Sequence, residues 1–211
     1  MFELEQRSEP MSDYTTAADG LPRWHPSPLV NSTIKRIRVH GWAITAVSGE
    51  CEFDSPDCTS PECPFGYTTG FGLHSIPELA VYGLDARTSG RVLNELGDLL
   101  HVYDSRAIVD ECAELSLRSI GAPIRLIELI DKEDLLITNE LFPNSPALQV
   151  VWPDERGNFP WSDSYTLQPD HQQIKGILPT KNSRRRGPRI TPNAGPNRDQ
   201  RRQAQRRKNR P

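Results

Sequence analysis

The sequence lacks every short motif that would assign a reaction on its own. It contains no G-x-S-x-G nucleophile elbow, no H-E-x-x-H zinc helix and no G-x-x-x-x-G-K-[ST] phosphate loop. Gly70-Phe71-Gly72 follows a segment typical of a strand, but the third glycine and the helix of a dinucleotide-binding fingerprint are missing. The motifs therefore assign no hydrolase, metalloprotease or nucleotide-binding class.

Long apolar runs are also missing. No stretch approaches 18 consecutive apolar residues, so we expect no membrane-spanning helix. The first residues, MFELEQRSEP, are acidic and lack the apolar centre of a secretory signal, so we expect a cytoplasmic protein. Only 36% of the 211 residues are hydrophobic and 19 are proline, which indicates that part of the chain stays unpacked.

Cysteine is scarce, with four residues in the chain. Cys51, Cys58 and Cys63 lie in one loop with the spacing C-x6-C-x4-C, which is looser than the paired knuckles that usually bind zinc. Free thiols in a reducing compartment are the favoured interpretation, and a zinc-stapled loop is the alternative. No other cofactor is indicated.

The net charge of −3 hides two segments of opposite sign. Residues 1–180 contain 13 basic and 27 acidic residues, a net charge of −14, whereas residues 181–211 contain 12 basic residues and one acidic residue, a net charge of +11. Arginine binds phosphate well, so this tail predicts contact with nucleic acid, and without aromatic residues beside it we expect little sequence specificity. The alternative is that the tail binds an acidic protein surface, including the acidic body of the same or a neighbouring molecule. The phosphate-binding candidates are Arg184, Arg185, Arg186, Arg189, Arg201, Arg202, Arg206, Arg207 and Lys208.

The apolar pattern divides the chain into a mobile leader (1–32), one α+β domain (33–170) and a disordered linker with the arginine-rich tail (171–211). We expect a mainly antiparallel sheet with two to three packed helices. The expected strands are residues 42–47, 65–72, 78–84, 124–130 and 147–152. The expected helices are residues 33–39, ending at Gly41, then 85–101 capped by Asp85, and 131–142, opened by Asp131 and stopped by Pro143.

The expected strand 65–72 is unusual because its two faces differ. Phe65, Tyr67, Thr69 and Phe71 alternate with Gly66, Thr68, Gly70 and Gly72, so one face is aromatic and the other nearly bare. A bare face permits close approach of a backbone, a helix or a ligand. Ordinary packing is the favoured explanation.

Polar and aromatic residues near this strand and near the last strand form the candidate site. His74 and Glu78 are four residues apart and are candidates for an acid–base pair, against the simpler interpretation as loop and strand-end residues. Gln149 interrupts the apolar strand ALQVVW, and its buried amide needs partners in the backbone or in a ligand. The ligand-binding candidates are Tyr67, Thr68, Gln149, Trp152, Asp154 and Trp161.

The segment after the last strand, WPDERGNFPW, has two interpretations. Proline and glycine make Pro153–Gly157 a good turn, so Asp154 is either a turn former or a ligand-binding residue. Trp152 and Trp161 flank the turn and form either an aromatic wall or the core of a hairpin.

The chain resembles the bacterial domain of unknown function 4262, a family common in actinobacteria and their phages, over roughly residues 33–170. The resemblance is carried by Gly41-Trp42-Ala43, Phe65, Tyr67-Thr68, Gly70, Pro77-Glu78-Leu79, Gly83-Leu84, Leu93-Asn94, Ala147-Leu148-Gln149, Val151-Trp152-Pro153-Asp154, Gly157, Phe159-Pro160-Trp161 and Gln168-Pro169. Members usually carry a histidine directly before the Pro-Glu-Leu step, where this chain has Ile76. The resemblance implies a fold and a site, but no reaction.

Three functions remain open from the sequence. The first is a small ligand-binding or interaction module with a pocket where the strand of residues 65–72 meets the turn after Trp152. The second is a nucleic-acid-associated protein that binds phosphates through its tail. The third is an enzyme that uses His74 and Glu78. The oligomeric state is not indicated.

Overall fold

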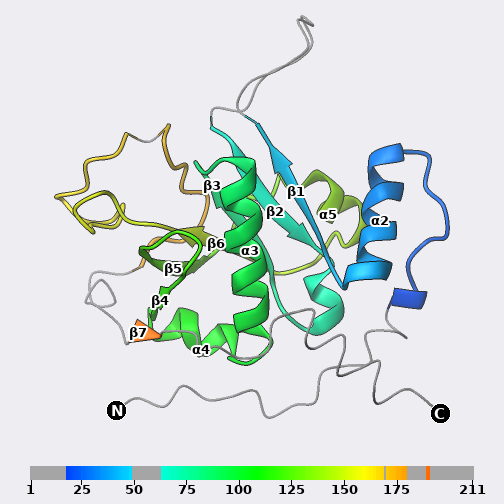
Figure 1. Cartoon of the computed structure of the whole chain (residues 1–211), viewed down its shortest axis with the longest axis horizontal. Coiled ribbons are helices and arrows are strands. Elements are labelled where there is room, and N and C mark those ends of the chain that lie inside the picture. Colours follow the sequence, from blue (N-terminus) through cyan, green and yellow to red (C-terminus); the bar gives the residue numbers. More distant parts are fainter. Residues whose placement is uncertain (1–17, 49–62, 169, 180–188, 191–211) are drawn as a thin grey trace, which may run out of the picture.

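One seven-stranded sheet forms the centre of the molecule (Figure 1). The computed structural model describes residues 18–48, 63–168, 170–179 and 189–190. The strands lie in the order β1-β2-β3-β6-β5-β4-β7, and all neighbours are antiparallel except the parallel pairs β3–β6 and β4–β7. The prediction of a mainly antiparallel α+β fold is therefore confirmed. The strands are β1 (Ala43–Val47), β2 (Phe65–Thr69), β3 (Glu78–Tyr82), β4 (Glu114–Ser116), β5 (Pro123–Glu128), β6 (Ala147–Val151) and β7 (Arg189–Ile190).

Four α-helices lie wholly within the described residues, where two to three were expected. They are α2 (Pro28–His40), α3 (Ala86–Leu100), α4 (Ser105–Asp110) and α5 (Leu136–Leu141). The side chain of Asp85 accepts hydrogen bonds from the amides of Arg87 and Thr88, so the predicted cap of α3 is present. In the part of the chain that is described, the helices are too short or too polar to span a bilayer.

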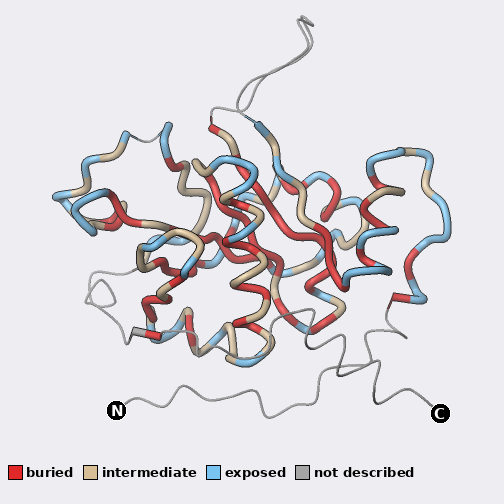
Figure 2. Tube along the Cα trace, viewed as in Figure 1, coloured by how far each residue is buried: buried red, intermediate tan, exposed pale blue. Residues whose placement is uncertain are grey.

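The helices cover both faces of the sheet, and most residues of the strands are buried (Figure 2). On one face α3 and α4 pack over alternate residues of β3, β5 and β6, with Leu93, Leu96 and Ile108 inside that core. On the opposite face α2 and α5 pack over the aromatic residues of β2 and β3. The segment after β6 covers the rest of this second face, where Phe159 and Trp161 pack on Ile127 and Val151.

The strand expected at residues 65–72 ends earlier, at Thr69. Gly70 has a φ of 108°, which turns the chain into a short 3₁₀ helix, η1 (Phe71–His74). Phe71 therefore leaves the expected aromatic face and packs against Trp42 on the α3 side. The bare face at Gly66 does receive a helix, since a Cβ there would lie 2.9 Å from the Cβ of Ser89 in α3.

The helix expected from Asp131 also begins later, at Leu136. The carboxylate of Asp131 accepts a hydrogen bond from the amide of Glu133 and pairs with Lys175, so it orders a loop and does not cap a helix. The sequence signal for a cap was present, but a tertiary ion pair holds the carboxylate elsewhere.

Packed residues extend beyond residues 33–170 on both sides. Leu21 and Val30 are buried against α2 and the sheet, and Gln172 and Ile190 are buried after residue 170. The leader expected at 1–32 and the linker expected from 171 therefore both contribute to the packed body.

Candidate functional site

An open groove of about 1630 Å³ crosses the face of the sheet that carries α2 and α5. Strands β1 and β2 form its floor, the N-terminal ends of α2 and α5 form one side, and residues 160–175 form the other. Its lining residues are Leu29, Thr45, Val47, Phe65, Tyr67, Glu133, Asp134, Leu136, Ile137, Pro160, Tyr165, Leu167, Gln168, Asp170, Gln172, Gln173, Ile174 and Lys175.

Two aromatic side chains of the floor, Phe65 and Tyr67, stack on each other, and Phe65 also stacks on a third ring in β3. The ring of Phe65 stacks on Tyr67 and on Tyr82, with centroid separations of 6.1 and 5.5 Å. The hydroxyl of Tyr67 accepts a hydrogen bond of 3.3 Å from the amide of Ile137, which fixes α5 over β2. Burial raises the pKa of Tyr67, so this hydroxyl stays protonated at neutral pH. Of the predicted ligand-binding residues, Tyr67 is the one that lines the groove.

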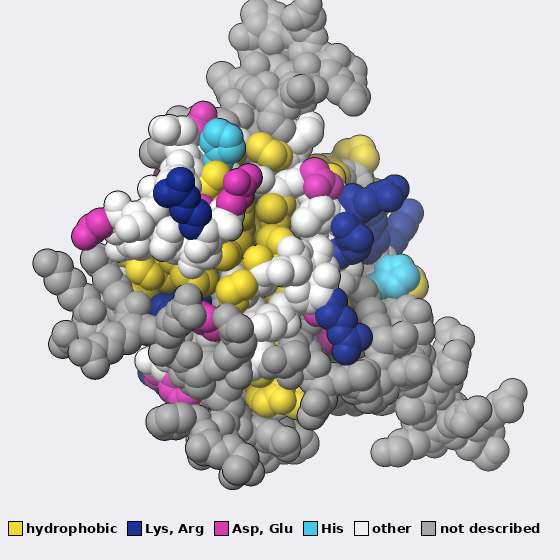
Figure 3. All heavy atoms as spheres, turned by 60° about the vertical axis from the view of Figure 1, so that its left-hand side comes forward, with side chains coloured by type: hydrophobic (Ala, Val, Ile, Leu, Met, Phe, Trp, Pro, Cys, Tyr) yellow, Lys and Arg dark blue, Asp and Glu magenta, His cyan; other side chains and the backbone are white. Residues whose placement is uncertain are grey.

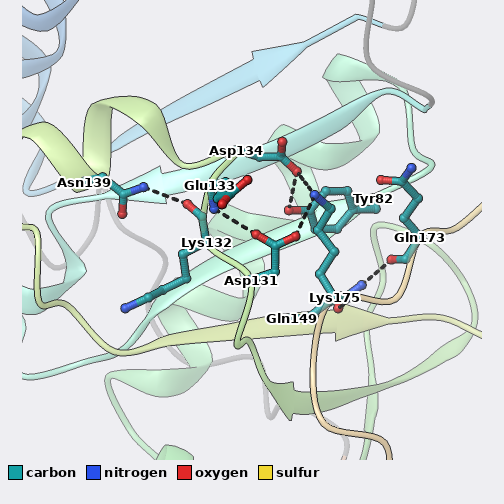
Figure 4. Close-up of polar contacts among 9 residues, drawn as sticks. All are labelled: Tyr82, Asp131, Lys132, Glu133, Asp134, Asn139, Gln149, Gln173 and Lys175. Atoms are coloured by element: carbon teal, nitrogen blue, oxygen red, sulfur yellow. Dashed lines mark hydrogen bonds and ion pairs between the residues drawn. The ribbon is translucent and has the colours of Figure 1, made fainter.

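Charged side chains meet at the end of this floor (Figure 4). The ammonium of Lys175 lies 3.1 Å from Asp131 Oδ2 and 2.7 Å from Asp134 Oδ2. The hydroxyl of Tyr82 donates to Asp134 Oδ2 at 3.1 Å. One lysine thus joins two carboxylates from the β5–α5 loop to the segment after residue 170.

The surroundings of Tyr82, Lys175 and Asp131 shift the pKa of each of these three groups away from neutral pH. Burial raises the pKa of Tyr82, and the neighbouring Asp134 raises it further. Burial acts to lower the pKa of Lys175, but its hydrogen bonds to Asp134 and Asp131 outweigh burial and raise it. The amide of Glu133 and the ammonium of Lys175 lower the pKa of Asp131. Lys175 is therefore charged at pH 7 and forms ion pairs with both carboxylates.

Gln149 holds the segment that carries Lys175. Its side chain is fully buried, its Oε1 accepts from the amide of Lys175 at 2.8 Å, and its Nε2 donates to the carbonyl of Gln173. Gln172 makes a second junction, donating to the carbonyl of Trp152 and accepting from its amide. The amide predicted to need partners has found them in the backbone, and it builds the wall of the groove.

Asp154 organises the turn after β6. Its Oδ1 accepts from the amides of Arg156 and Asn158, and its Oδ2 accepts from the amide and hydroxyl of Thr166. Burial acts to raise the pKa of Asp154, but the hydrogen bonds from Asn158 and Thr166 lower it to about 2. These bonds fix the loop from which Tyr165 and Leu167 line the groove.

Trp152 and Trp161 do not form a shared wall. The indole of Trp152 donates to the carbonyl of Tyr82 at 3.0 Å, whereas Trp161 stacks on Phe159 with a centroid separation of 4.9 Å. The guanidinium of Arg125 lies over Phe159 and Trp161 and pairs with the buried Glu114 at 3.1 Å. Both tryptophans lie outside the lining of the groove: Trp152 packs against the core under α3, and Trp161 packs with Ile127 and Val151.

Thr68 and Glu78 form a buried pair away from the groove lining. The hydroxyl of Thr68 donates to Glu78 Oε2 at 2.7 Å, and the amides of Gly70 and Gly72 donate to Oε1. Burial raises the pKa of Glu78, and the hydrogen bonds from Thr68 and these amides oppose the rise. This carboxyl group holds the turn between β2 and η1.

The ring of His74 makes its polar contacts with residues other than Glu78. Its Nε2 lies 3.1 Å from the carbonyl of Gly41, and its Nδ1 lies 3.4 Å from Nε2 of His101. The oxygens of Glu78 bind Thr68 and the glycine amides, so the two residues of the expected acid–base pair do not meet in a hydrogen bond. The pairing of His74 with a histidine outside the sequence motif was not expected.

The remaining predicted residues lie largely outside the described part of the chain. Cys51, Cys58 and the arginine-rich tail residues fall there, apart from the backbone of Arg189 in β7. Cys63 is buried and is not in a disulfide. Within the described residues no three His, Cys, Asp or Glu side chains are grouped as metal ligands, and the zinc loop stays a prediction.

Four residues of the charged cluster were not among the predicted site residues: Tyr82, Asp131, Asp134 and Lys175. A signal was present in Asp131-Lys132-Glu133-Asp134, an acidic run directly after an apolar strand, but it was interpreted as the start of a helix. Lys175 had no such signal, because its segment has few apolar residues and its position depends on the side chain of Gln149.

The fold and the groove define a class: an α+β protein with an open, aromatic-floored and acidic-rimmed groove on one face of its sheet. The family model described as domain of unknown function (DUF4262) matches residues 36–166, and the chain belongs to this family. Neither the curated proteins nor the solved structures contain a match.

We expect Gln149→Leu to lower the free energy of unfolding by about 1–3 kcal/mol, because the amide of Lys175 and the carbonyl of Gln173 lose their buried partner. Urea denaturation measures the change, and the amide of Lys175 should exchange with solvent faster. Gln168→Leu, at an exposed position in the same groove, is the control. Equal unfolding free energies for both variants would contradict the role of Gln149.

Asp154→Asn should change the acid dependence of stability. The folded-state pKa of about 2 lies below the ordinary 3.8, so the carboxylate stabilises the fold above about pH 4, and this contribution is lost as the pH falls towards 2. The variant should be less stable than the parent at pH 7, with the difference shrinking between pH 4 and 2. Thermal unfolding at each pH measures it, with Asp163→Asn at an exposed position as control. A difference independent of pH would count against this assignment.

Proposed function

We propose that this protein is a binding module whose ligand lies in the groove over β1 and β2. The observation that carries the proposal is the groove itself, about 1630 Å³ in volume and built from five separate parts of the chain. Ligand sites are typically concave, mainly apolar and equipped with a few fixed polar groups. The stacked floor and the Asp131–Lys175–Asp134 cluster meet this description.

Buried hydrogen bonds also preorganise the groove for binding. Gln149, Gln172 and Asp154 fix its wall through buried hydrogen bonds, so little conformational entropy remains to be lost when a ligand enters. Two large apolar side chains, Leu29 and Leu136, remain 59% and 72% exposed where they line the groove. Exposed apolar side chains at the edge of a concave site favour a ligand with an apolar part.

Filling the groove with a larger side chain tests this proposal. Thr45 lines the groove and its neighbour Ala46 is exposed outside the lining, so Thr45→Trp and Ala46→Trp make a matched pair on one strand. We expect a panel of charged amphipathic small molecules and short peptides to contain at least one that raises Tm of the parent. A ligand at about 100 times its Kd stabilises by about 2.7 kcal/mol, which shifts Tm by several degrees.

The same ligand should still stabilise Ala46→Trp and should have no effect on Thr45→Trp. If Thr45→Trp responds as strongly as the parent, or if no member of the panel raises Tm, the groove is not the binding site.

A second candidate function is nucleic-acid association through the tail. It is favoured by the ten arginines and two lysines in residues 181–211, which suit sequence-independent phosphate contacts. Binding of the full-length chain to unrelated duplexes should fall roughly a hundredfold between 50 and 200 mM salt. Fluorescence anisotropy measures this. Replacing Arg201, Arg202, Arg206, Arg207 and Lys208 by Gln should remove most of the affinity, and undiminished binding would exclude the tail as the contact.

A further inference from the structure

We infer that the groove binds an arginine-bearing segment, and that its occupant is the basic run of this chain at residues 198–208. This inference rests on the proposed function of the groove as a binding site. It names the chemistry of the ligand, a guanidinium-rich peptide, and a source for it within the same sequence.

Charge complementarity is the first argument. The groove lining contains the carboxylates of Glu133, Asp134 and Asp170 and the single ammonium of Lys175. That ammonium is already paired with Asp131 and Asp134, so it does not offset the charge of Glu133 or Asp170. Residues 198–208 contain six basic residues and one acidic residue. A positive peptide therefore enters a site of net negative charge.

The shape and the apolar surface of the groove favour arginine over a small cation. An arginine carries a long apolar stem, and Leu29 and Leu136 offer exposed apolar surface on one side of the groove. Its planar guanidinium binds carboxylates through two parallel hydrogen bonds and stacks on aromatic rings such as that of Tyr165, which lines the opposite side. An open groove accepts a chain segment, whereas a closed cavity would not.

The chain is long enough to reach. Ile190 in β7 is fixed at the edge of the sheet, next to β4, and the groove floor lies at the other edge on β1 and β2. Seven strands spaced about 4.8 Å apart separate these edges by roughly 30 Å. Position 201 lies 11 residues beyond Ile190 and position 208 lies 18 residues beyond it, distances of up to about 37 and about 60 Å in an extended chain. Most of the basic run can therefore reach the groove of its own molecule.

Charge is unevenly distributed over the body. Binding in the groove can therefore be distinguished from non-specific electrostatic attraction to the protein. On the face shown in Figure 3, the largest group of Lys and Arg side chains lies at the right-hand margin, apart from the hydrophobic strip in the middle. A basic peptide that only followed net charge would respond equally to the loss of any exposed carboxylate. A peptide held in the groove responds to its lining carboxylates alone.

The experiment uses a fluorescent peptide of residues 196–211 and a chain that ends at Ile190, which retains β7 and its pairing with β4. Anisotropy should show saturable binding that weakens with salt. Full-length protein should bind the same peptide at least about tenfold more weakly, because its own tail competes for the groove at high effective concentration. A peptide with every arginine replaced by lysine should bind more weakly at the same charge.

Matched variants of the shortened chain locate the site. Glu133→Gln with Asp170→Asn removes two exposed lining charges and should weaken binding about fivefold. Asp110→Asn with Glu111→Gln removes two exposed charges at the end of α4, outside the lining, and should leave the affinity unchanged.

The inference is overturned if the peptide does not bind the shortened chain, if both double variants lose the same affinity for the peptide, or if the shortened and full-length chains bind the peptide equally well. If the shortened chain fails to bind this peptide while Thr45→Trp still abolishes stabilisation by a panel ligand, the groove is a binding site and only its occupant is wrong. If a nucleic acid binds full-length protein as tightly as it binds the isolated peptide, the groove does not hold the tail.

Discussion

The buried amide of Gln149 connects the sheet to the segment that forms one side of the groove, and the geometry of the site follows from that connection. Segment 172–177 runs beside two neighbouring strands: it bonds to Trp152 after β6, to Gln149 within β6, and to Glu128 and Ile130 at the end of β5. The residue before this segment also comes so close that a Cβ on Gly83 would lie 1.7 Å from the carbonyl oxygen of His171. Lys175 meets Asp131 and Asp134 because these bonds fix the path of its backbone.

This arrangement separates the charges of the groove into two kinds. Asp131 and Asp134 hold Lys175 and join two distant parts of the chain, so they are part of the wall. Glu133 and Asp170 are exposed and line the site, and the carboxylate of Asp170 also lies 3.1 Å from Nδ1 of the exposed His171. Both tyrosine hydroxyls hold the structure together: Tyr82 donates to Asp134, and Tyr67 accepts from the amide of Ile137 in α5.

Much of the fold could be predicted because it depends on local patterns. The apolar stripe of α3, its Asp85 cap and the strand at residues 147–151 follow from spacing alone. The early end of β2 was missed because the alternation of large and small residues continues through Phe71, and only the backbone at Gly70 shows the turn. The late start of α5 was missed because Asp131 is used by a lysine 44 positions along the chain.

The candidate site was harder to predict than the fold. Gln149 and Asp154 were recognisable as polar residues that need partners, and Tyr67 as an aromatic residue beside a strand of glycines. Their sequence context did not show that the first two support the site and the third lines it. The role of Lys175 could not be predicted, because it depends on contacts with distant parts of the chain, and local sequence patterns carry no information about such contacts.

The buried carboxyl group of Glu78 has a consequence for how this chain can vary. Its carboxyl group joins Thr68 and the amides of Gly70 and Gly72 across a turn that only a residue tolerant of positive φ can make. A larger residue at Gly70 would also approach Ile37 of α2 within 3.2 Å. Replacing one member leaves the others with unmet hydrogen bonds or strain, so a change at one of these four positions affects the other three. The turn also limits how closely α2 lies against the sheet, through the contact between Gly70 and Ile37.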